Sequence, residues 1–442
     1  MSRRSALALF LILGYAAISC AQRNATDPNI RFYQWKVSKD PEYYVNYDRL
    51  GSAYAQKARE TGDTAFYPLA ESAFQKSLEL VPSIRPESGA PLAHLAALRF
   101  SEHLFDESTV LAGKALERDP KLDVANATLG DAFLETGEYE RAAFAYAKLQ
   151  RPEDSITPRP GLDFLRESRT ANLNFIQGNT ESAIQHMKTA VQMAIHANLP
   201  KENIAWTQFS LGELYFEMGD FSKAEASYEA ALRTSPGYHR ALAWLAQIRS
   251  AQGKYQEAAS LYRKAIAVIP LPVYVAALGD VYMKNGQAAE AKKQYGLVEY
   301  IGKLNALNQR LYNRELAIYY ADHDVKLEES LELLQNELKV RHDIYTWDAY
   351  AWVLEKNHQP REAAEAMTNA LRMGTKSALL FYHAGVIYES NGDPVKAGEY
   401  LRRAIATNPR FHIFYADQAN RTLRSLALVS QNAADSKRGA LR

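Results

Sequence analysis

The sequence predicts an all-α fold, an elongated solenoid built from about ten helix-turn-helix units of about 34 residues each. Two observations lead to this prediction. The segment 210–236, SLGELYFEMGDFSKAEASYEAALRTSP, places small and aromatic residues at helical spacing on both sides of a turn. The same arrangement returns with a period of 34 residues at several places along the chain.

Within this segment the spacing of small and aromatic residues predicts two helices that pack closely. Gly212 and Tyr215 lie on one face of the first helix, and Ala224, Tyr228 and Ala231 lie on one face of the second. The small residues allow the helix axes to approach to about 8–10 Å, and the tyrosines fill the space beside them. The segment therefore predicts a hairpin of two helices with its own packed seam.

Turn and stop signals mark the ends of these helices. The dipeptide Gly-Asp at 219–220 predicts the turn, and Pro236 ends the second helix because its ring blocks continuation. Weaker copies of the pattern lie at roughly 164–197, 309–342 and 344–376. In the clearer copies a glycine or alanine stands at the position of Gly212: Gly51, Ala96, Gly130, Ala246, Gly279 and Gly385.

This 34-residue pattern resembles the tetratricopeptide repeat (TPR) family over roughly residues 41–410. The resemblance implies a right-handed superhelix with about eight repeats in each turn, so that this chain would form a little more than one turn. It also implies that the first helix of each repeat lines the concave face. Repeats of this family hold protein segments, and the resemblance therefore implies a protein partner.

The repeats divide the chain into a long solenoid with distinct segments at both ends. We expect irregular joins where the period is interrupted, near 151–161 and 198–203. The predicted segments are a signal peptide at 1–20, a tether at 21–40, the solenoid at 41–410, a capping helix at 411–430 and a flexible tail at 431–442.

The N-terminus has the pattern of a bacterial export signal. A basic start, MSRR, is followed by an apolar run at 5–19 that is shorter than a membrane span of about 20 residues. The run ends at Cys20, the only cysteine, and AISC resembles a lipoprotein signal in which this cysteine is acylated. With Ala21 next, the resemblance implies the outer membrane in a Gram-negative cell. Ordinary cleavage without lipid and an uncleaved anchor are the alternatives.

Composition and motifs argue against several classes of function. The chain has 442 residues, of which 47% are hydrophobic and 23% charged, and its formal net charge is +1. This balance does not favour binding of nucleic acid. The sequence lacks the HExxH, CxxC, GxSxG and phosphate-loop patterns. We therefore expect a protein that is not an enzyme, needs no cofactor or metal, and does not bind small molecules.

The concave positions implied by the resemblance predict a partner-binding groove. Aromatic side chains at such positions would bury a large area on a partner at low cost in entropy. The alternative is that these rings pack inside a tight superhelix or against an inserted tail. The predicted groove residues are Trp206, Phe209, Glu213, Phe216, Met283, Tyr345, Asp348, Trp352 and Tyr382.

Together these features predict a non-enzymatic scaffold for protein interactions in the bacterial cell envelope, holding an extended or helical segment in its groove. We expect it in the periplasm or cell envelope, held at a membrane by a lipid anchor at Cys20. The first alternative is a TPR regulator or adaptor that is cytoplasmic or anchored in the inner membrane. The second alternative is an enzyme of an unrecognised type.

Overall fold

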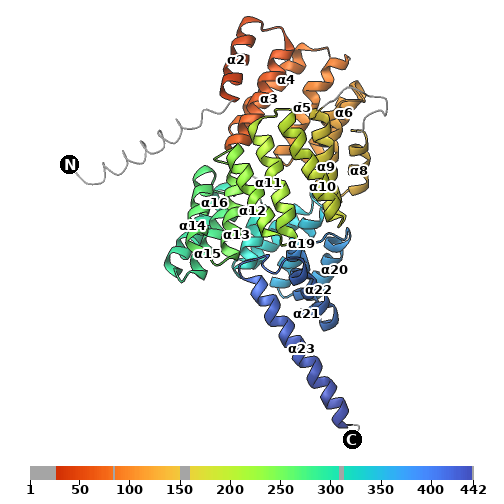
Figure 1. Cartoon of the computed structure of the whole chain (residues 1–442). Helices are drawn as coiled ribbons and strands as arrows, with labels where there is room; N and C mark the ends of the chain where they lie inside the picture. Colours follow the sequence, from red (N-terminus) through yellow and green to blue (C-terminus); the bar gives the residue numbers. More distant parts are fainter. Residues whose placement is uncertain (1–25, 83–84, 150–159, 308–312, 441–442) are drawn as a thin grey trace, which may run out of the picture.

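The computed structural model describes residues 26–440, apart from 83–84, 150–159 and 308–312. Within these ranges the chain forms 22 α-helices and one short 3₁₀ helix, with no strand, which confirms the predicted all-α class (Figure 1). The helices are α2 (Thr26–Lys39), α3 (Tyr44–Thr61), α4 (Phe66–Leu80), η1 (Pro86–Ser88), α5 (Gly89–Ser101), α6 (Phe105–Arg118), α7 (Asp123–Glu135), α8 (Tyr139–Ala147), α9 (Pro160–Ile176), α10 (Thr180–His196), α11 (Lys201–Glu217), α12 (Phe221–Thr234), α13 (His239–Ala251), α14 (Tyr255–Val268), α15 (Pro272–Lys284), α16 (Ala288–Leu307), α17 (Asn313–Asp322), α18 (Leu327–Glu337), α19 (Ile344–Lys356), α20 (Pro360–Leu371), α21 (Ala378–Ser390), α22 (Pro394–Thr407) and α23 (Tyr415–Ala440).

The helices from α3 to α22 pack as ten successive pairs, in agreement with the number of units that the period predicts. Each pair begins with an odd-numbered helix, and consecutive pairs stack side by side (Figure 1). At the second predicted join, α10 ends at His196 and α11 begins at Lys201, with Asn198 between them at a φ of 48°. Most of the first predicted join, 150–159, lies outside the described residues.

Each pair is held together by the small-residue seam that the sequence predicts. In the α11–α12 pair, a methyl group added to Gly212 would overlap the ring of Tyr228. Ala224, Tyr228 and Ala231 are fully buried. The same arrangement joins Gly279 to the ring of Tyr295 in the α15–α16 pair. The glycines are therefore required for close approach of two helices, and the aromatic rings fill the seam.

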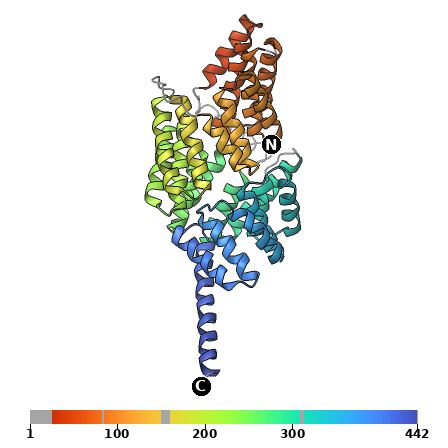
Figure 2. The same cartoon turned by 90° about the vertical axis from the view of Figure 1, so that its right-hand side faces the viewer.

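Successive turns of the superhelix touch, so that repeats far apart in the sequence lie side by side (Figure 2). Arg341 pairs with Glu135, which is 206 residues earlier, and the side-chain amide of Asn408 donates to the carbonyl of Phe216, 192 residues earlier. One turn thus spans about 200 residues, or about six repeats of 34 residues. This is fewer than the eight repeats per turn that the resemblance implies, so that expectation is wrong here.

Turn glycines make this contact close. Gly137 and Gly178 have φ angles of 75° and 76°, and any side chain on them would meet the backbone of the later turn at His342 and Gly374. Gly253 has nearly the same φ, 74°, but faces open space. A turn glycine with positive φ thus serves the hairpin in seven of the ten pairs, while His103, Asp324 and His358 adopt positive φ in the other three, and only some of these glycines also serve the contact between turns.

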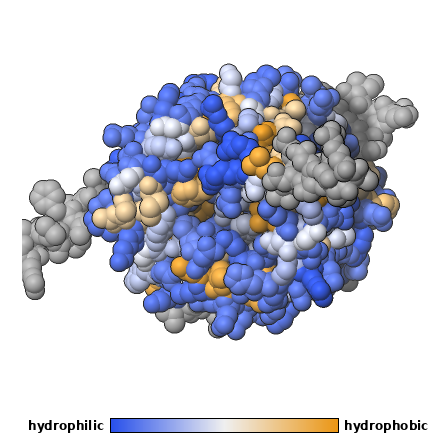
Figure 3. Space-filling model, turned by 90° about the horizontal axis from the view of Figure 1, so that it is seen from below, coloured by the Kyte–Doolittle hydropathy of each residue, from blue (hydrophilic) through white to orange (hydrophobic). Residues whose placement is uncertain are grey.

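At the C-terminal end, the residues just before and at the start of α23 fill the concave face of the last repeats. The ring of Tyr415 stacks on Tyr382 with centroids 4.7 Å apart, and Phe411 lies 5.6 Å from the same ring. Helix α23 then projects away from the solenoid (Figures 1 and 2). It continues to Ala440, whereas the sequence predicted a capping helix to residue 430 and a flexible tail. Seen from this end, the surface is mainly hydrophilic with separate small hydrophobic groups (Figure 3).

At the N-terminal end, most of the predicted tether is a helix that packs on the first repeat. Helix α2 covers residues 26–39 and buries Ile30 against α3. The predicted signal peptide, including Cys20, lies outside the described residues. Among the helices that the structure describes, none combines the length and the apolar character needed to span a bilayer.

Candidate partner-binding cavity

The interior of the superhelix contains a cavity of about 1170 Å³. Most of its wall comes from the first helices of successive repeats, namely α3, α5, α7, α9, α11 and α13, and Tyr345 of α19 adds a side chain from the next turn. These are the helices that the family resemblance assigns to the concave face. The cavity therefore exists because the repeats curve until two turns meet around a shared hollow.

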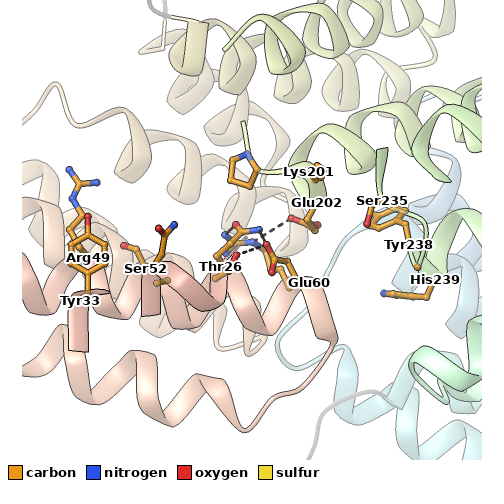
Figure 4. Close-up of a pocket in the computed structure, with 16 residues that line it drawn as sticks. Thr26, Tyr33, Arg49, Ser52, Glu60, Lys201, Glu202, Ser235, Tyr238 and His239 are labelled. Carbon is orange, nitrogen blue, oxygen red and sulfur yellow. Dashed lines mark hydrogen bonds and ion pairs between the residues drawn. The ribbon is translucent and has the colours of Figure 1, made fainter. Parts of the chain in front are cut away.

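A second hollow of about 560 Å³ lies between α2–α3 and the start of α11 and α13 (Figure 4). It shares lining residues with the larger cavity, so the two hollows lie next to each other. Polar contacts hold its walls: the Thr26 hydroxyl donates to Glu60 at 2.6 Å, and Arg59 lies 3.9 Å from the carboxylate of Glu202. The shared residues are Ser52, Arg59, Glu202, Tyr238 and His239.

Charged side chains of both signs line the cavity: Asp131, Glu135, Glu202, Glu213 and Glu217, with Arg59, Arg169 and Arg240. Burial raises the pKa of Glu213 to about 8, and the nearby Arg240 opposes this rise. Burial also raises the pKa of Glu217 to about 7, against hydrogen bonds from Ser377 and Ala378. Both carboxyl groups thus lack the compensation that would keep them fully ionised at neutral pH. A cationic side chain entering the cavity would provide the positive charge that favours their ionised form.

Aromatic side chains lie beside these charges. Trp206 projects from α11, partly buried, with its ring edge-on to Phe164 at 6.4 Å between centroids. Tyr345, which is 37% exposed, faces the same cavity from the following turn. The cavity therefore offers aromatic surface from two turns of the superhelix, together with the acidic groups Glu213 and Glu217.

The structure brings only part of the predicted groove together. Three of the nine predicted residues, Trp206, Glu213 and Tyr345, line the cavity. Met283 is 44% exposed on α15 and lies outside it. Asp348 is buried and accepts a hydrogen bond from His383, with 3.0 Å between Oδ1 and Nδ1. Whether any of these residues binds a partner stays a prediction.

The remaining four predicted residues are core side chains, contrary to the expectation of exposed rings. Phe209 packs between Tyr228, Tyr238 and Trp244, and Phe216 packs against Phe221. Trp352 and Tyr382 are covered by Tyr415. The concave surface at these positions is filled by neighbouring repeats and by the residues just before and at the start of α23. These rings therefore follow the alternative of internal packing.

Other lining residues were not selected from the sequence. The TPR resemblance places Glu217 and Arg240 at inner positions, but they are not among the nine predicted groove residues. Arg59, Glu202 and His239 line the second hollow because α2–α3 and the start of α11 and α13, which are far apart in the sequence, meet there. Periodicity contains no signal for such a meeting. Among the residues that the structure describes, there is no group of three or more His, Cys, Asp or Glu that could hold a metal ion.

The raised pKa of Glu213 predicts a stability that falls as the pH rises. Its folded-state pKa of about 8 exceeds the ordinary value of 4.5, so the folded protein binds more protons than the unfolded chain between these values. Stability is therefore fully present below about pH 4.5 and is lost as the pH rises towards 8. We expect Glu213→Gln to raise the melting temperature at pH 8 and to flatten this pH dependence. Thermal melts at pH 5 and pH 8 measure the effect.

The exposed Glu365 provides the matched control for this substitution. Glu365→Gln removes the same charge from a solvated helix face and should leave the pH dependence of the melting temperature as it is in the parent. Equal pH slopes for the parent and Glu213→Gln would show that the carboxyl group is not desolvated in the folded chain.

Two family models described as "Tetratricopeptide repeat" match the chain. One covers residues 209–270 and 350–410, and the other covers 167–237. Among curated proteins, the chain is similar to the human protein O-mannosyl-transferase TMTC1, with 27% identity over 217 residues, and to the Arabidopsis thaliana CTR9 homolog, with 26% over 217 residues. The matches cover 45% and 46% of this chain, but only 23% and 19% of those proteins.

Solved structures of low identity also align with the chain. BtubC from P. vanneervenii aligns at 19% identity and a TM-score of 0.39, covering 48% of this chain and 92% of that chain. The Cut9–Hcn1 hetero-tetramer aligns at 15% and 0.33 with 96% of both chains, and yeast Tom70 at 12% and 0.32 with 87% and 97%. From the family-model matches and the observed helix pairs, we conclude that the chain carries tetratricopeptide repeats within residues 167–270 and 350–410 and has the solenoid fold that such repeats build.

Proposed function

We propose that this protein is a non-enzymatic interaction scaffold that holds a segment of a protein partner in the cavity of its superhelix. The observation that carries this proposal is the placement of Glu213 and Glu217 beside Trp206 and Tyr345 in one hollow. Aromatic surface favours apolar anchors, and carboxyl groups with raised pKa favour a cation that would restore their charge. The preferred partner segment therefore combines apolar and basic side chains.

The proposal includes a location in the bacterial cell envelope with a lipid anchor at Cys20. Its support is the sequence of residues 1–20, with a basic start, an apolar run and a cysteine at its end. The alternative is a TPR regulator or adaptor that is cytoplasmic or anchored in the inner membrane. The intact mass of the chain purified from its host decides between them, because acylation at Cys20 and an unmodified start at Met1 give different masses.

A photocrosslinking amino acid placed at Tyr345 in the host tests the cavity. We expect it to capture one partner through a peptide that contains basic and apolar residues. The same group placed at Phe144, which is 67% exposed on α8, is the control and should not capture this partner. Equal capture from both positions, or no capture at Tyr345, would overturn the cavity as the binding site.

A cavity variant extends this test. Glu213→Gln with Glu217→Gln removes the acidic groups but keeps the shape of the side chains. We expect it to reduce capture from Tyr345, since the basic side chain of the partner would lose its counter-charges. Unchanged capture would show that the acidic groups do not contribute to recognition.

A further inference from the structure

One face of α2 presents aromatic and basic side chains to solvent. Phe32 and Trp35 are 49% and 52% exposed, and Arg31 and Lys39 are exposed beside them. These positions fall within one stripe of the helix, because residues three and four apart share a face. The Lys36 ammonium lies 5.8 Å from the ring centroids of both Phe32 and Trp35. Exposed large aromatics grouped with cations on one face are typical of an interaction surface.

The opposite face of α2 fixes the orientation of this stripe. Ile30 is buried among residues of α3 and α4. An ion pair joins Asp27 to Lys57 at 2.5 Å, and the Gln34 side-chain amide donates to the Tyr54 hydroxyl at 2.9 Å. Helix α2 is therefore part of the folded solenoid, and its aromatic stripe cannot turn inward without breaking these contacts.

The chain that precedes α2 indicates what this face meets. The apolar run 5–19 and Cys20 stand directly before it in the sequence, and six residue steps separate Cys20 from Thr26. Even fully extended, six steps reach only about 20 Å. If residues 1–20 attach the chain to a membrane, as the proposed function holds, then α2 lies close to the lipid surface.

We propose that the exposed face of α2 is a membrane-contact surface that seats Phe32 and Trp35 in the interface of an anionic lipid bilayer. Tryptophan and phenylalanine on one face of a helix favour the boundary between headgroups and acyl chains. Arg31, Lys36 and Lys39 lie at the same face and attract acidic headgroups. Asp40 and Glu42 follow in the next turn and weaken this attraction, so burial of the two rings contributes most of the binding.

This contact would orient the whole solenoid. A lipid chain at Cys20 fixes one point of the protein, whereas a second contact through a helix that is docked on the first repeat fixes a direction. The inference rests on the proposed membrane attachment, but it is independent of what the cavity binds. Its test therefore needs no protein partner, and its failure leaves the crosslinking test at Tyr345 unaffected.

The fluorescence of Trp35 measures the contact directly. The chain purified from host membranes is reconstituted with vesicles of phosphatidylethanolamine and phosphatidylglycerol that contain brominated phosphatidylcholine. Subtracting the emission of a Trp35→Phe variant isolates the signal of Trp35 from the four other tryptophans, Trp206, Trp244, Trp347 and Trp352. We expect Trp35 emission to shift to shorter wavelength, to be quenched by the brominated lipid and to lose its quenching by acrylamide in water.

The control variant keeps the same lipid anchor and carries its reporter tryptophan at another position. In the Trp35→Phe background, Phe144→Trp places a tryptophan on α8, which lies well away from α2 (Figure 1). Its emission should be quenched by acrylamide and not by brominated lipid. Trp35 that stays open to acrylamide overturns the proposal. Trp35 that is shielded from acrylamide without quenching by brominated lipid also overturns it, since a protein partner or a second copy of the chain would then cover this face.

Discussion

Replacing Trp352 with alanine is expected to lower the free energy of unfolding by about 3–5 kcal/mol, the usual range for a large aromatic removed from a core. Trp352 is only 2% exposed. Its ring stacks on His383 at 4.3 Å between centroids and meets Tyr415 edge-on at 5.6 Å. The indole nitrogen donates to the half-buried Asp322 at 2.8 Å, so the substitution also leaves this carboxylate with one donor fewer.

Urea unfolding followed by circular dichroism measures this loss. Trp35→Ala is the matched control: the same substitution on the exposed face of α2, where Trp35 is 52% exposed, should change stability by much less. Trp352→Ala with the stability of the parent would mean that the residues at the start of α23, Tyr415 among them, do not fill the last repeats in solution. The ring would then be accessible, and its role as a groove residue would be restored.

The contrast between Tyr228 and Trp352 shows what sequence periodicity can predict. Tyr228 packs on Gly212, 16 residues away in the same hairpin, and this contact returns with the period. The helix pairs, their seams and the concave helices could therefore be predicted. Trp352 is covered by Tyr415, which is outside the repeats. No periodic signal reports where a nonrepeating segment folds back, and the pattern alone cannot separate a groove aromatic from a covered one.

The same limit explains the missed contact between turns. Glu135 and Arg341 each have the sequence context of an exposed residue near the end of a repeat helix. The pitch of the superhelix decides whether they meet, and this pitch depends on many small packing angles between neighbouring repeats. A small difference in each angle, summed over the turn, changes eight repeats per turn into about six. The second hollow, between α2–α3 and the start of α11 and α13, depends on the same packing angles.

Arg341 has the second large expected effect, because it links the two turns through buried charge. Its side chain is 7% exposed and pairs with Glu135 of the earlier turn. It also lies 3.3 Å from Glu337 and 3.6 Å from Asp343. Arg341→Met keeps most of the side-chain volume but leaves these carboxylates without their shared cation. We expect a loss of about 3–5 kcal/mol, the cost of leaving a buried charge unpaired.

The loss should depend on pH in a defined direction. Burial raises the pKa of Glu135 and of Glu337, and the charge of Arg341 opposes both rises. Without Arg341 both folded-state pKa values rise further above the unfolded value, so the stability of the variant falls more steeply as the pH increases. The difference from the parent should therefore be larger at pH 8 than at pH 5, where protonation relieves the unpaired charge. Chemical unfolding at the two pH values measures it.

Arg233→Met is the control that distinguishes the loss of the contact between turns from the loss of an ordinary ion pair. The Arg233 side chain is 70% exposed and lies 3.7 Å from Glu229 within one helix, so its removal should cost about 0–1 kcal/mol at either pH.

The shape of the unfolding transition is a second measurement. Repeat arrays unfold as coupled neighbours, and the Arg341 contacts couple repeats 206 residues apart. Arg341→Met should broaden the unfolding transition or split it, whereas Arg233→Met should leave it single. A single sharp transition of unchanged midpoint in Arg341→Met would show that the two turns do not depend on this contact.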